Sequence, residues 1–246
     1  MRLLLTGATG VAGLAIYRAA LNDPIVTSVT ILSRRAIPSW AELPANASSK
    51  TEVILHEDFT SYPPELAQKL ATHDACIWAL GKASAGMNEQ DYTKLTYDYP
   101  MAAARALKHA GVGTGRAENP FRFVYISGEA ADPTEKSFMM WARVKGRAEK
   151  DLTEFCNGSE GMLAHILRPA YFFPSKNYPE DRKNQRSSSA AYADCIMTPL
   201  ISTLLPGQYT PVEDLGRFAV EAAKGRWSDE TLFRNARMRE LLKQAE

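Results

Sequence analysis

The fold is decided near the start of the chain, by RLLLTGATGVAGLAIYRAAL at residues 2–21. An apolar strand over residues 2–6 is followed by a GxxGxxG turn, Gly7 to Gly13, and then by a helical pattern over residues 11–21. In such a turn the glycines let the backbone approach a pyrophosphate and let the helix pack on the strand. The free N–H groups of the helix N-terminus, from Thr9 to Val11, then face the phosphates. The stretch therefore predicts a dinucleotide site with Gly7, Thr9, Gly10, Val11 and Gly13, and the alternative is a tight turn without a ligand.

The rest of the chain alternates short apolar runs with helical patterns, which favours βαβ units and a parallel sheet. We expect six strands, over residues 2–6, 28–32, 52–55, 75–80, 121–127 and 162–167. The pattern predicts one α/β domain over residues 1–246, a Rossmann doubly wound parallel sheet with a small C-terminal substrate lobe from about 170–246. We expect a final helix over about 231–244 and a long polar loop over 176–189, either a lid or a solvated loop. Ligands of such sheets bind at the carboxyl ends of the strands.

The composition limits the possible partners. Lys and Arg number 29 against 28 Asp and Glu, which argues against binding to nucleic acid or to an anionic membrane surface. No run of 18 apolar residues is present, and the first apolar run is too short for a signal peptide. Cys76, Cys156 and Cys195 lie far apart without metal-ligand spacing. We therefore expect a cytoplasmic protein, a monomer or homodimer, without a metal site and with a small-molecule substrate.

The end of the second strand carries Ser33-Arg34-Arg35. NAD sites usually place an acidic side chain there to accept from the ribose 2′-hydroxyl, and a carboxylate would repel a 2′-phosphate. A guanidinium instead pairs with a phosphate through two hydrogen bonds. Arg34 and Arg35 therefore favour NADP over NAD, unless they are ordinary surface charges.

Two further strand ends hold candidate cofactor contacts. Asp58 and Phe59 follow the third strand, where a carboxylate and a ring could contact adenine; the alternative is a capping Asp and a core Phe. Leu80 and Gly81 follow the fourth strand and allow close approach to a cofactor ribose, although Gly81 could equally form a turn.

Four segments together, TGATGVAG at 6–13, YISGEA with Ser127, WARVKGRAE at 141–149 and LRPAYFFP at 167–174, carry a resemblance to a known family. The chain resembles the short-chain dehydrogenase/reductase superfamily, closest to its atypical and extended branches, which include nucleoside-diphosphate-sugar epimerases and NmrA-like proteins. The resemblance implies an NAD(P)-binding enzyme. It also implies that the backbone near Pro169 contacts the nicotinamide carboxamide.

In that family a catalytic Tyr precedes a Lys by four residues on one helix, and a Ser or Thr follows the fifth strand. The Lys holds the nicotinamide ribose and lowers the pKa of the Tyr, while the Ser orients the substrate oxygen. Ser127 and Lys145 match two of these positions, but Trp141 stands at that of the Tyr. An indole cannot shuttle protons, so Trp141 is either a wall of the pocket or core filling, and Lys145 could be a surface lysine.

Three functions follow from this departure. The first is an NADP-dependent oxidoreductase acting on a small or medium apolar carbonyl or alkene, with another proton donor. Tyr171 is the first candidate; Tyr125, Tyr92, Tyr97 and a water held by Ser127 come after it. The second is a non-redox isomerase, cyclase or dehydratase with bound NADP, and the third is a non-catalytic NADP-binding sensor. The aromatic residues after the sixth strand, Tyr171, Phe172 and Phe173, predict an apolar pocket, unless the Phe side chains are core.

Overall fold

The computed structural model describes residues 1–186, 194, 198, 199, 201 and 203–245. Cys195 and the end of the predicted 176–189 loop lie outside the described residues. The strands are Arg2–Thr6 (β1), Ser28–Ser33 (β2), Thr51–Leu55 (β3), Ala75–Trp78 (β4), Phe121–Ile126 (β5), Met162–Arg168 (β6) and Leu232–Arg234 (β7). The α-helices are Val11–Asn22 (α1), Ala47–Lys50 (α2), Pro64–Leu70 (α3), Glu89–Thr93 (α4), Tyr99–His109 (α5), Met140–Asn157 (α6), Pro179–Gln185 (α7), Val212–Lys224 (α9) and Asn235–Lys243 (α10). A π-helical turn, η1 (Lys94–Asp98), joins α4 to α5, and a 3₁₀ turn, η2, covers Pro206–Gln208.

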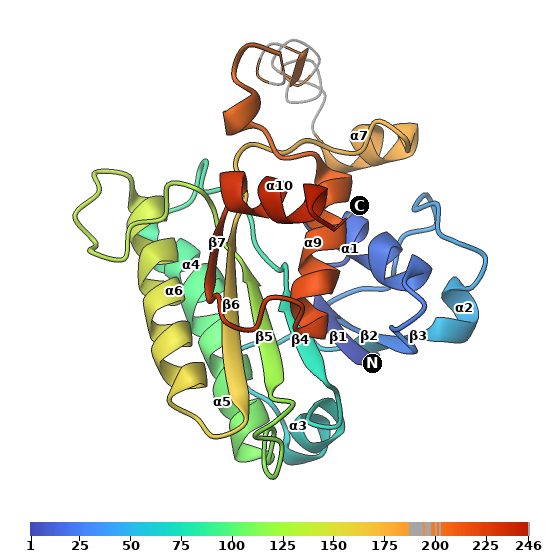
Figure 1. The fold of residues 1–246 in the computed structure, drawn as a ribbon, viewed down its shortest axis with the longest axis vertical. Coiled ribbons are helices and arrows are strands. Elements are labelled where there is room, and N and C mark those ends of the chain that lie inside the picture. Colours follow the sequence, from blue (N-terminus) through green and yellow to red (C-terminus); the bar gives the residue numbers. More distant parts are fainter. Residues whose placement is uncertain (187–193, 195–197, 200, 202, 246) are drawn as a thin grey trace.

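All the described strands form one parallel sheet in the order β3-β2-β1-β4-β5-β6-β7. The chain reverses its direction of growth between β1 and β4, so the carboxyl ends of these two strands flank the crevice where such sheets bind ligands. This arrangement confirms the predicted Rossmann doubly wound α/β fold (Figure 1).

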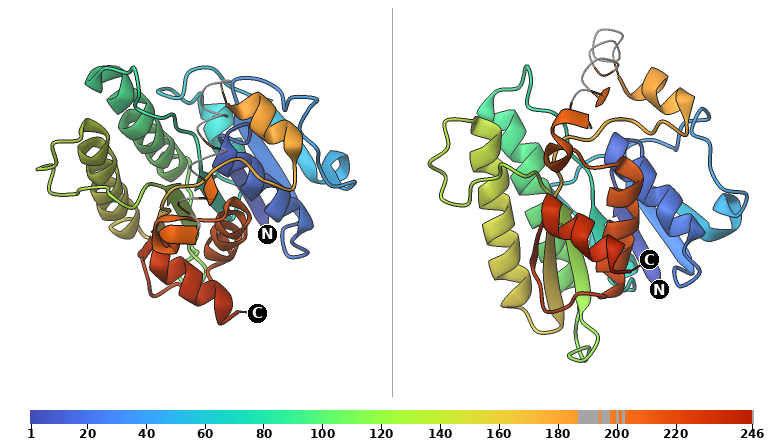
Figure 2. Two further views of the ribbon diagram at one scale, coloured as in Figure 1. Left: turned by 90° about the horizontal axis from the view of Figure 1, so that it is seen from above. Right: turned by 45° about the horizontal axis from the view of Figure 1, so that its top comes forward.

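Helices cover both faces of the sheet (Figure 2). One apolar core lies between the sheet and α1, α9 and α10, and a second lies between the opposite face and α3, α5 and α6. Because both faces are covered, inner strands are apolar on both sides. In β1, Leu3, Leu4 and Leu5 are all buried, and every residue of β4 and β5 is buried as well.

The residues after 170 contribute to the sheet and to its helical layer. Helix α9 packs against α1, and an added Cβ on Gly216 would lie only 2.7 Å from the carbonyl oxygen of Ala15. Strand β7 extends the sheet beside β6, and α10 follows it. By contrast, α7 lies across the end of the molecule where the strands finish (Figure 1).

Three details of the expected secondary structure were wrong. Residues 232–234 form strand β7, so the sheet gains a strand and the final helix begins only at Asn235. A segment of three residues with one buried side chain, Phe233, is too short to show the alternation of apolar and polar residues that indicates a strand. The polar segment over 176–189 contains helix α7, and β4 ends at Trp78.

Candidate functional site

The glycine turn is closed by backbone contacts that exclude side chains. Gly7 has φ +72°, and a Cβ there would lie 2.4 Å from the carbonyl oxygen of Ala79. A Cβ on Gly13 would lie 2.0 Å from the carbonyl oxygen of Gly7, so α1 starts directly against the turn. The Gly10 N–H donates to the Gly7 carbonyl at 2.9 Å, which fixes the bend. The first N–H groups of α1 therefore face the space beyond the sheet and offer an anion site.

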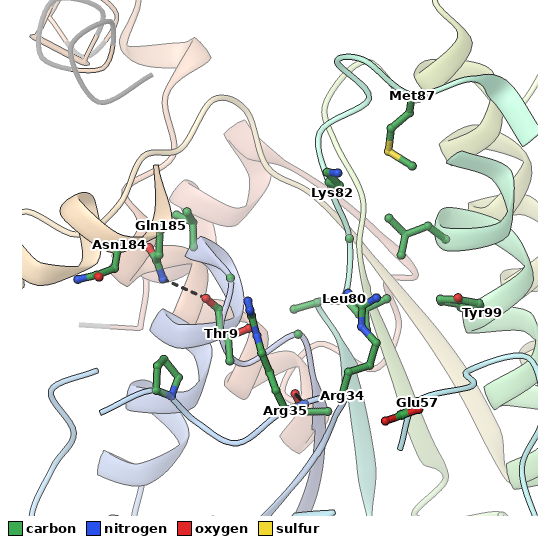
Figure 3. A pocket seen from close by; sticks show the side chains of 18 of the residues that line it. Thr9, Arg34, Arg35, Glu57, Leu80, Lys82, Met87, Tyr99, Asn184 and Gln185 are labelled. Atoms are coloured by element: carbon green, nitrogen blue, oxygen red, sulfur yellow. Dashed lines mark hydrogen bonds between the residues drawn. The ribbon is translucent and has the colours of Figure 1, made fainter. Parts of the chain in front are cut away.

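A cavity of about 1200 Å³ opens in front of this turn (Figure 3). Its volume is large enough for a dinucleotide. It is lined by the glycine turn, by the segments that follow β2, β3 and β4, by α4 and η1, and by the end of α7. The lining residues predicted from the sequence are Gly7, Thr9, Gly10, Val11, Arg34, Arg35, Leu80 and Gly81. Those that the sequence reasoning missed include Trp40, Glu57, Lys82, Met87, Asp91, Lys94, Leu95, Tyr99, Asn184 and Gln185.

The charged groups of the lining are mainly cationic. Arg34, Arg35, Lys82 and Lys94 line the cavity, against the carboxylates of Glu57 and Asp91. In the part of the chain that the structure describes, none of the four cations has an ion-pair partner. Unpaired cations around a cavity favour an anionic ligand.

The turn η1 widens the helix at the cavity wall, and Pro100 explains it. Pro100 lacks an N–H for the carbonyl of Thr96 four residues earlier, and in a regular helix its ring would clash with that carbonyl. The N–H of Tyr99 donates to the Lys94 carbonyl, five residues back, and the Tyr125 hydroxyl donates to the Thr96 carbonyl at 3.0 Å. The widened turn is therefore stabilised from β5.

Helix α7 is fastened over the glycine turn by a buried ion pair. Arg18 of α1 donates from Nη1 and Nη2 to the two carboxylate oxygens of Asp181, at 2.5 and 2.9 Å, and these residues are only 5% and 2% exposed. The Arg18 guanidinium also stacks on Tyr178, 3.5 Å from its ring centre. At the end of α7 the Gln185 side chain reaches the Thr9 carbonyl at 3.5 Å (Figure 3). Arg18 falls on the apolar stripe of the first helix, and this was the sequence signal for the ion pair.

Ser127 and Lys145 lie together beyond β5, apart from the cavity lining. Lys145 Nζ donates to the carbonyl oxygens of Ile126 and Ser127, at 3.4 and 3.3 Å. Ser127 is buried, and within the described residues its hydroxyl has no hydrogen-bond partner. Burial lowers the pKa of Lys145 to about 8, although the carboxylate of Glu149 opposes the shift. An unpartnered hydroxyl beside an ammonium group can orient and polarise an oxygen of a ligand.

The shifted pKa of Lys145 gives a signed prediction. The unfolded chain binds the lysine proton up to about pH 10.4, whereas the folded chain releases it near pH 8, so this residue's contribution to the free energy of unfolding rises with pH across that window. We expect Lys145→Met to stabilise the protein more, or to destabilise it less, at pH 7 than at pH 10. Chemical denaturation of both proteins at the two pH values measures this, and an equal difference at both would contradict the prediction.

A second buried ion pair supports α6, the helix that carries Lys145. Arg168, at the end of β6, donates from Nε to both carboxylate oxygens of Glu149 at 3.0 Å and from Nη2 to one of them. Glu149 lies one turn after Lys145 on α6, so the pair fixes this face of the helix against β6. Trp141 lies one turn before Lys145 and is partly buried.

Several predicted site residues lie elsewhere. The Phe59 ring is fully buried in the core against Trp78 and Tyr99, which favours the core alternative over a contact with adenine. Asp58 is exposed and accepts from the Thr60 N–H and hydroxyl, so it caps a turn, and Glu57 lines the cavity in its place. Pro169 is buried and does not line the cavity.

The candidate proton donors are not brought to the cavity either. Tyr171 is 64% exposed and its backbone pairs with Tyr209. The other three tyrosines each have a hydrogen-bond partner: Tyr125 with the Thr96 carbonyl, Tyr97 with Asp151 and Tyr92 with the Thr96 side chain. Phe173 is buried and Phe172 packs on the core, so the structure favours the core alternative for both.

Two curated relatives show how far sequence similarity extends. The chain is 32% identical over 152 residues to "Leucinostatins biosynthesis cluster protein T" of Purpureocillium lilacinum, covering 62% of this chain and 51% of that protein. It is 26% identical over 228 residues to "Protein FMP52, mitochondrial" of Candida albicans, covering 91% of this chain and 88% of that protein. The chain thus spans about half the length of the first relative and most of the second. No family model matches it.

Solved structures agree over almost the whole chain. A Pseudomonas aeruginosa RhlG/NADP active-site complex superposes with a TM-score of 0.63 and 17% identity, covering 96% of both chains. An oxidoreductase of the short-chain dehydrogenase/reductase family from Burkholderia thailandensis has a TM-score of 0.63 and 14% identity, covering 95% of this chain and 90% of that one. The chain has the fold of the short-chain dehydrogenase/reductase superfamily. A UDP-N-acetylglucosamine 4-epimerase from Methanobrevibacter ruminantium shares this fold, with a TM-score of 0.63 and 17% identity over 94% of this chain and 74% of that one.

The relatives correct the expected cytoplasmic localisation. Relatives from Candida albicans, Emericella nidulans and Aspergillus fumigatus are named mitochondrial. The expectation rested on sparse cysteines and on the lack of a signal peptide, and a mitochondrial protein can share both features. Within the described residues, no helix has the length and apolar character that crossing a membrane requires.

Proposed function

We propose that this chain is an NADP-dependent oxidoreductase acting on a carbonyl or alkene metabolite. We also propose that it works in mitochondria, since several of its relatives are named mitochondrial. The observation that carries the proposal is the glycine turn, which leaves no room for a Cβ at Gly7 or Gly13 and opens on a cavity with unpaired cations. A turn without a ligand would not need both features. Of the similar structures, the Pseudomonas aeruginosa RhlG complex contains NADP.

The residues present fit a nicotinamide dinucleotide. The N–H groups at the start of α1 would hold the pyrophosphate, and Arg34 with Arg35 would lie at the adenosine end. Lys145 and Ser127 do not line the cavity, so the nicotinamide end of the cofactor would extend beyond it, where Lys145 would donate to the ribose and the Ser127 hydroxyl to the substrate oxygen. When bound, the cofactor would supply the hydride, and the protein would position and polarise the acceptor.

Cofactor binding can be followed by intrinsic fluorescence, since Trp40 lines the cavity. Titration with NADPH and with NADH should show quenching by both and tighter binding of NADPH. If neither binds, the proposal fails.

Trp141 gives the sharpest test of the oxidoreductase assignment. Trp141→Tyr places a phenol one helical turn before the Lys145 ammonium, whose charge would lower the phenol pKa. We expect NADPH oxidation with a panel of aldehydes and ketones to rise by about 100-fold, the usual gain from general acid catalysis. Loss of absorbance by the reduced nicotinamide measures it. Trp141→Phe is the matched control, because it keeps an aromatic side chain without a titratable group, and it should show no gain.

A non-redox isomerase or a cofactor-binding sensor is the second candidate. Trp141 favours it, because the wild-type chain lacks the family's proton shuttle. If NADPH binds but neither the wild type nor Trp141→Tyr consumes it, the oxidoreductase proposal is overturned in favour of this one.

A further inference from the structure

The wall of the cavity formed by α4, η1 and α5 carries a cation at a defined place. Lys94, Leu95 and Tyr99 of this wall line the cavity. In a regular α-helix, residues 94 and 99 would point about 140° apart, because each residue turns about 100°. The π turn, with its bond from the Tyr99 N–H to the Lys94 carbonyl, lets both residues reach the same cavity. Such turns occur frequently at functional sites.

The position of Lys94 relative to the sheet follows from its neighbours. Tyr99 packs on Phe59 just after β3, with ring centres 5.7 Å apart. Hydrogen bonds from Thr60 hold the pKa of Asp58 below its usual value, and the charge of Lys94 lowers it further, so Lys94 is near the end of β3.

The end of β3 adjoins Arg34. Strands β2 and β3 pair in parallel as far as Ser33 and Leu55, and the N–H of His56 donates to the Ser33 carbonyl at 2.9 Å. Arg34 and Glu57 follow the ends of these two strands and lie at one corner of the cavity (Figure 3). Lys94 and Leu95 of η1 line the same cavity. At this corner Arg34, Arg35 and Lys94 stand against the carboxylate of Glu57, which lines the cavity, and that of Asp58, whose pKa the Lys94 charge lowers.

We propose that Lys94 is a specificity-determining residue that binds the 2′-phosphate of the dinucleotide together with Arg34, from the side of the site opposite β2. This inference rests on the proposed NADP-binding function. Arg34 supplies a planar, two-pronged donor and Lys94 a point charge, so the phosphate is neutralised from two elements that are far apart in sequence. The π turn imposed by Pro100 and stabilised by Tyr125 presents this lysine to the site.

Adenosine 2′,5′-bisphosphate and 5′-AMP isolate the interaction, because they differ only in the 2′-phosphate. Isothermal titration calorimetry should show that the wild type prefers the bisphosphate. Lys94→Met should reduce that preference by about tenfold, the effect of one charge-assisted hydrogen bond, while binding of 5′-AMP changes little. Lys94→Arg should restore the preference. Lys150→Met is the matched control, since it removes the same side chain from an exposed position on α6 outside the cavity lining, and it should keep the preference.

The outcomes separate the two proposals. If the wild type binds neither compound, or binds both equally, the NADP assignment is overturned and this inference with it. If the wild type prefers the bisphosphate, and Arg34→Met removes that preference while Lys94→Met does not, Lys94 has no such role and the NADP assignment stands. Thermal denaturation of each variant verifies that it is folded.

Discussion

Gly13→Ala is expected to weaken NADPH binding by at least about 100-fold, or about 2.7 kcal/mol, and to lower the melting temperature as well. The new Cβ would lie 2.0 Å from the Gly7 carbonyl oxygen, which is backbone and cannot turn aside. Helix α1 would have to move away from the turn, and the N–H groups that face the phosphates would move with it. Fluorescence titration and thermal denaturation measure the two effects.

Gly81→Ala provides the control for this experiment. Gly81 lines the same cavity, yet an added Cβ there would meet no atom within 4 Å. Its melting temperature should match that of the wild type. A Gly13→Ala protein with normal NADPH affinity would show that the turn does not position the cofactor.

Breaking the buried pair between Arg18 and Asp181 should have the second large effect. Asp181→Asn leaves the Arg18 charge buried and uncompensated, which typically costs about 3–5 kcal/mol. Local release of α7 relieves this cost, because it exposes the Arg18 charge to water. We therefore expect rapid tryptic cleavage after Arg182, Lys183 and Arg186, which the wild type resists. NADPH should bind about tenfold more weakly, because Asn184 and Gln185 would leave the cavity.

Two variants test whether the buried pair itself is responsible. Glu52→Gln removes a partner from the Lys69–Glu52 pair, whose side chains are about half exposed, and should change stability by less than about 0.5 kcal/mol. The double variant Arg18→Met, Asp181→Leu removes both charges and should recover much of the lost stability. If Asp181→Asn resists trypsin as well as the wild type does, α7 is held by other contacts.

The sequence predicts the Rossmann fold and the glycine turn because both depend on local signals. A glycine triplet between an apolar strand and an apolar helix has one structural solution, and Gly7 and Gly13 adopt it. The signal at the end of β2 is also local: Arg34, predicted there as a cofactor contact, lines the cavity.

The missed parts of the site depend on contacts that are distant in sequence. Lys94 reaches the cavity only because Pro100 widens the helix and Tyr125 of β5 donates to the freed Thr96 carbonyl. A proline within an apparent helix was the available signal. Asp181 is 163 positions from Arg18, and Phe59 lies in the core because Trp78 and Tyr99 surround it. The local sequence of the polar segment around α7 gives no indication that Asp181 pairs with Arg18.

The close packing of α9 on α1 has a consequence for how the chain is made. The first helix, which follows the glycine turn, packs its apolar face mainly against α9, residues 212–224, and its Arg18 is buried against Asp181 of α7. During synthesis that apolar face stays exposed until nearly the whole chain has left the ribosome. Contacts between such distant segments slow folding and leave apolar surface open to aggregation. The start of the chain therefore completes its packing only after residues 212–224 have been synthesised.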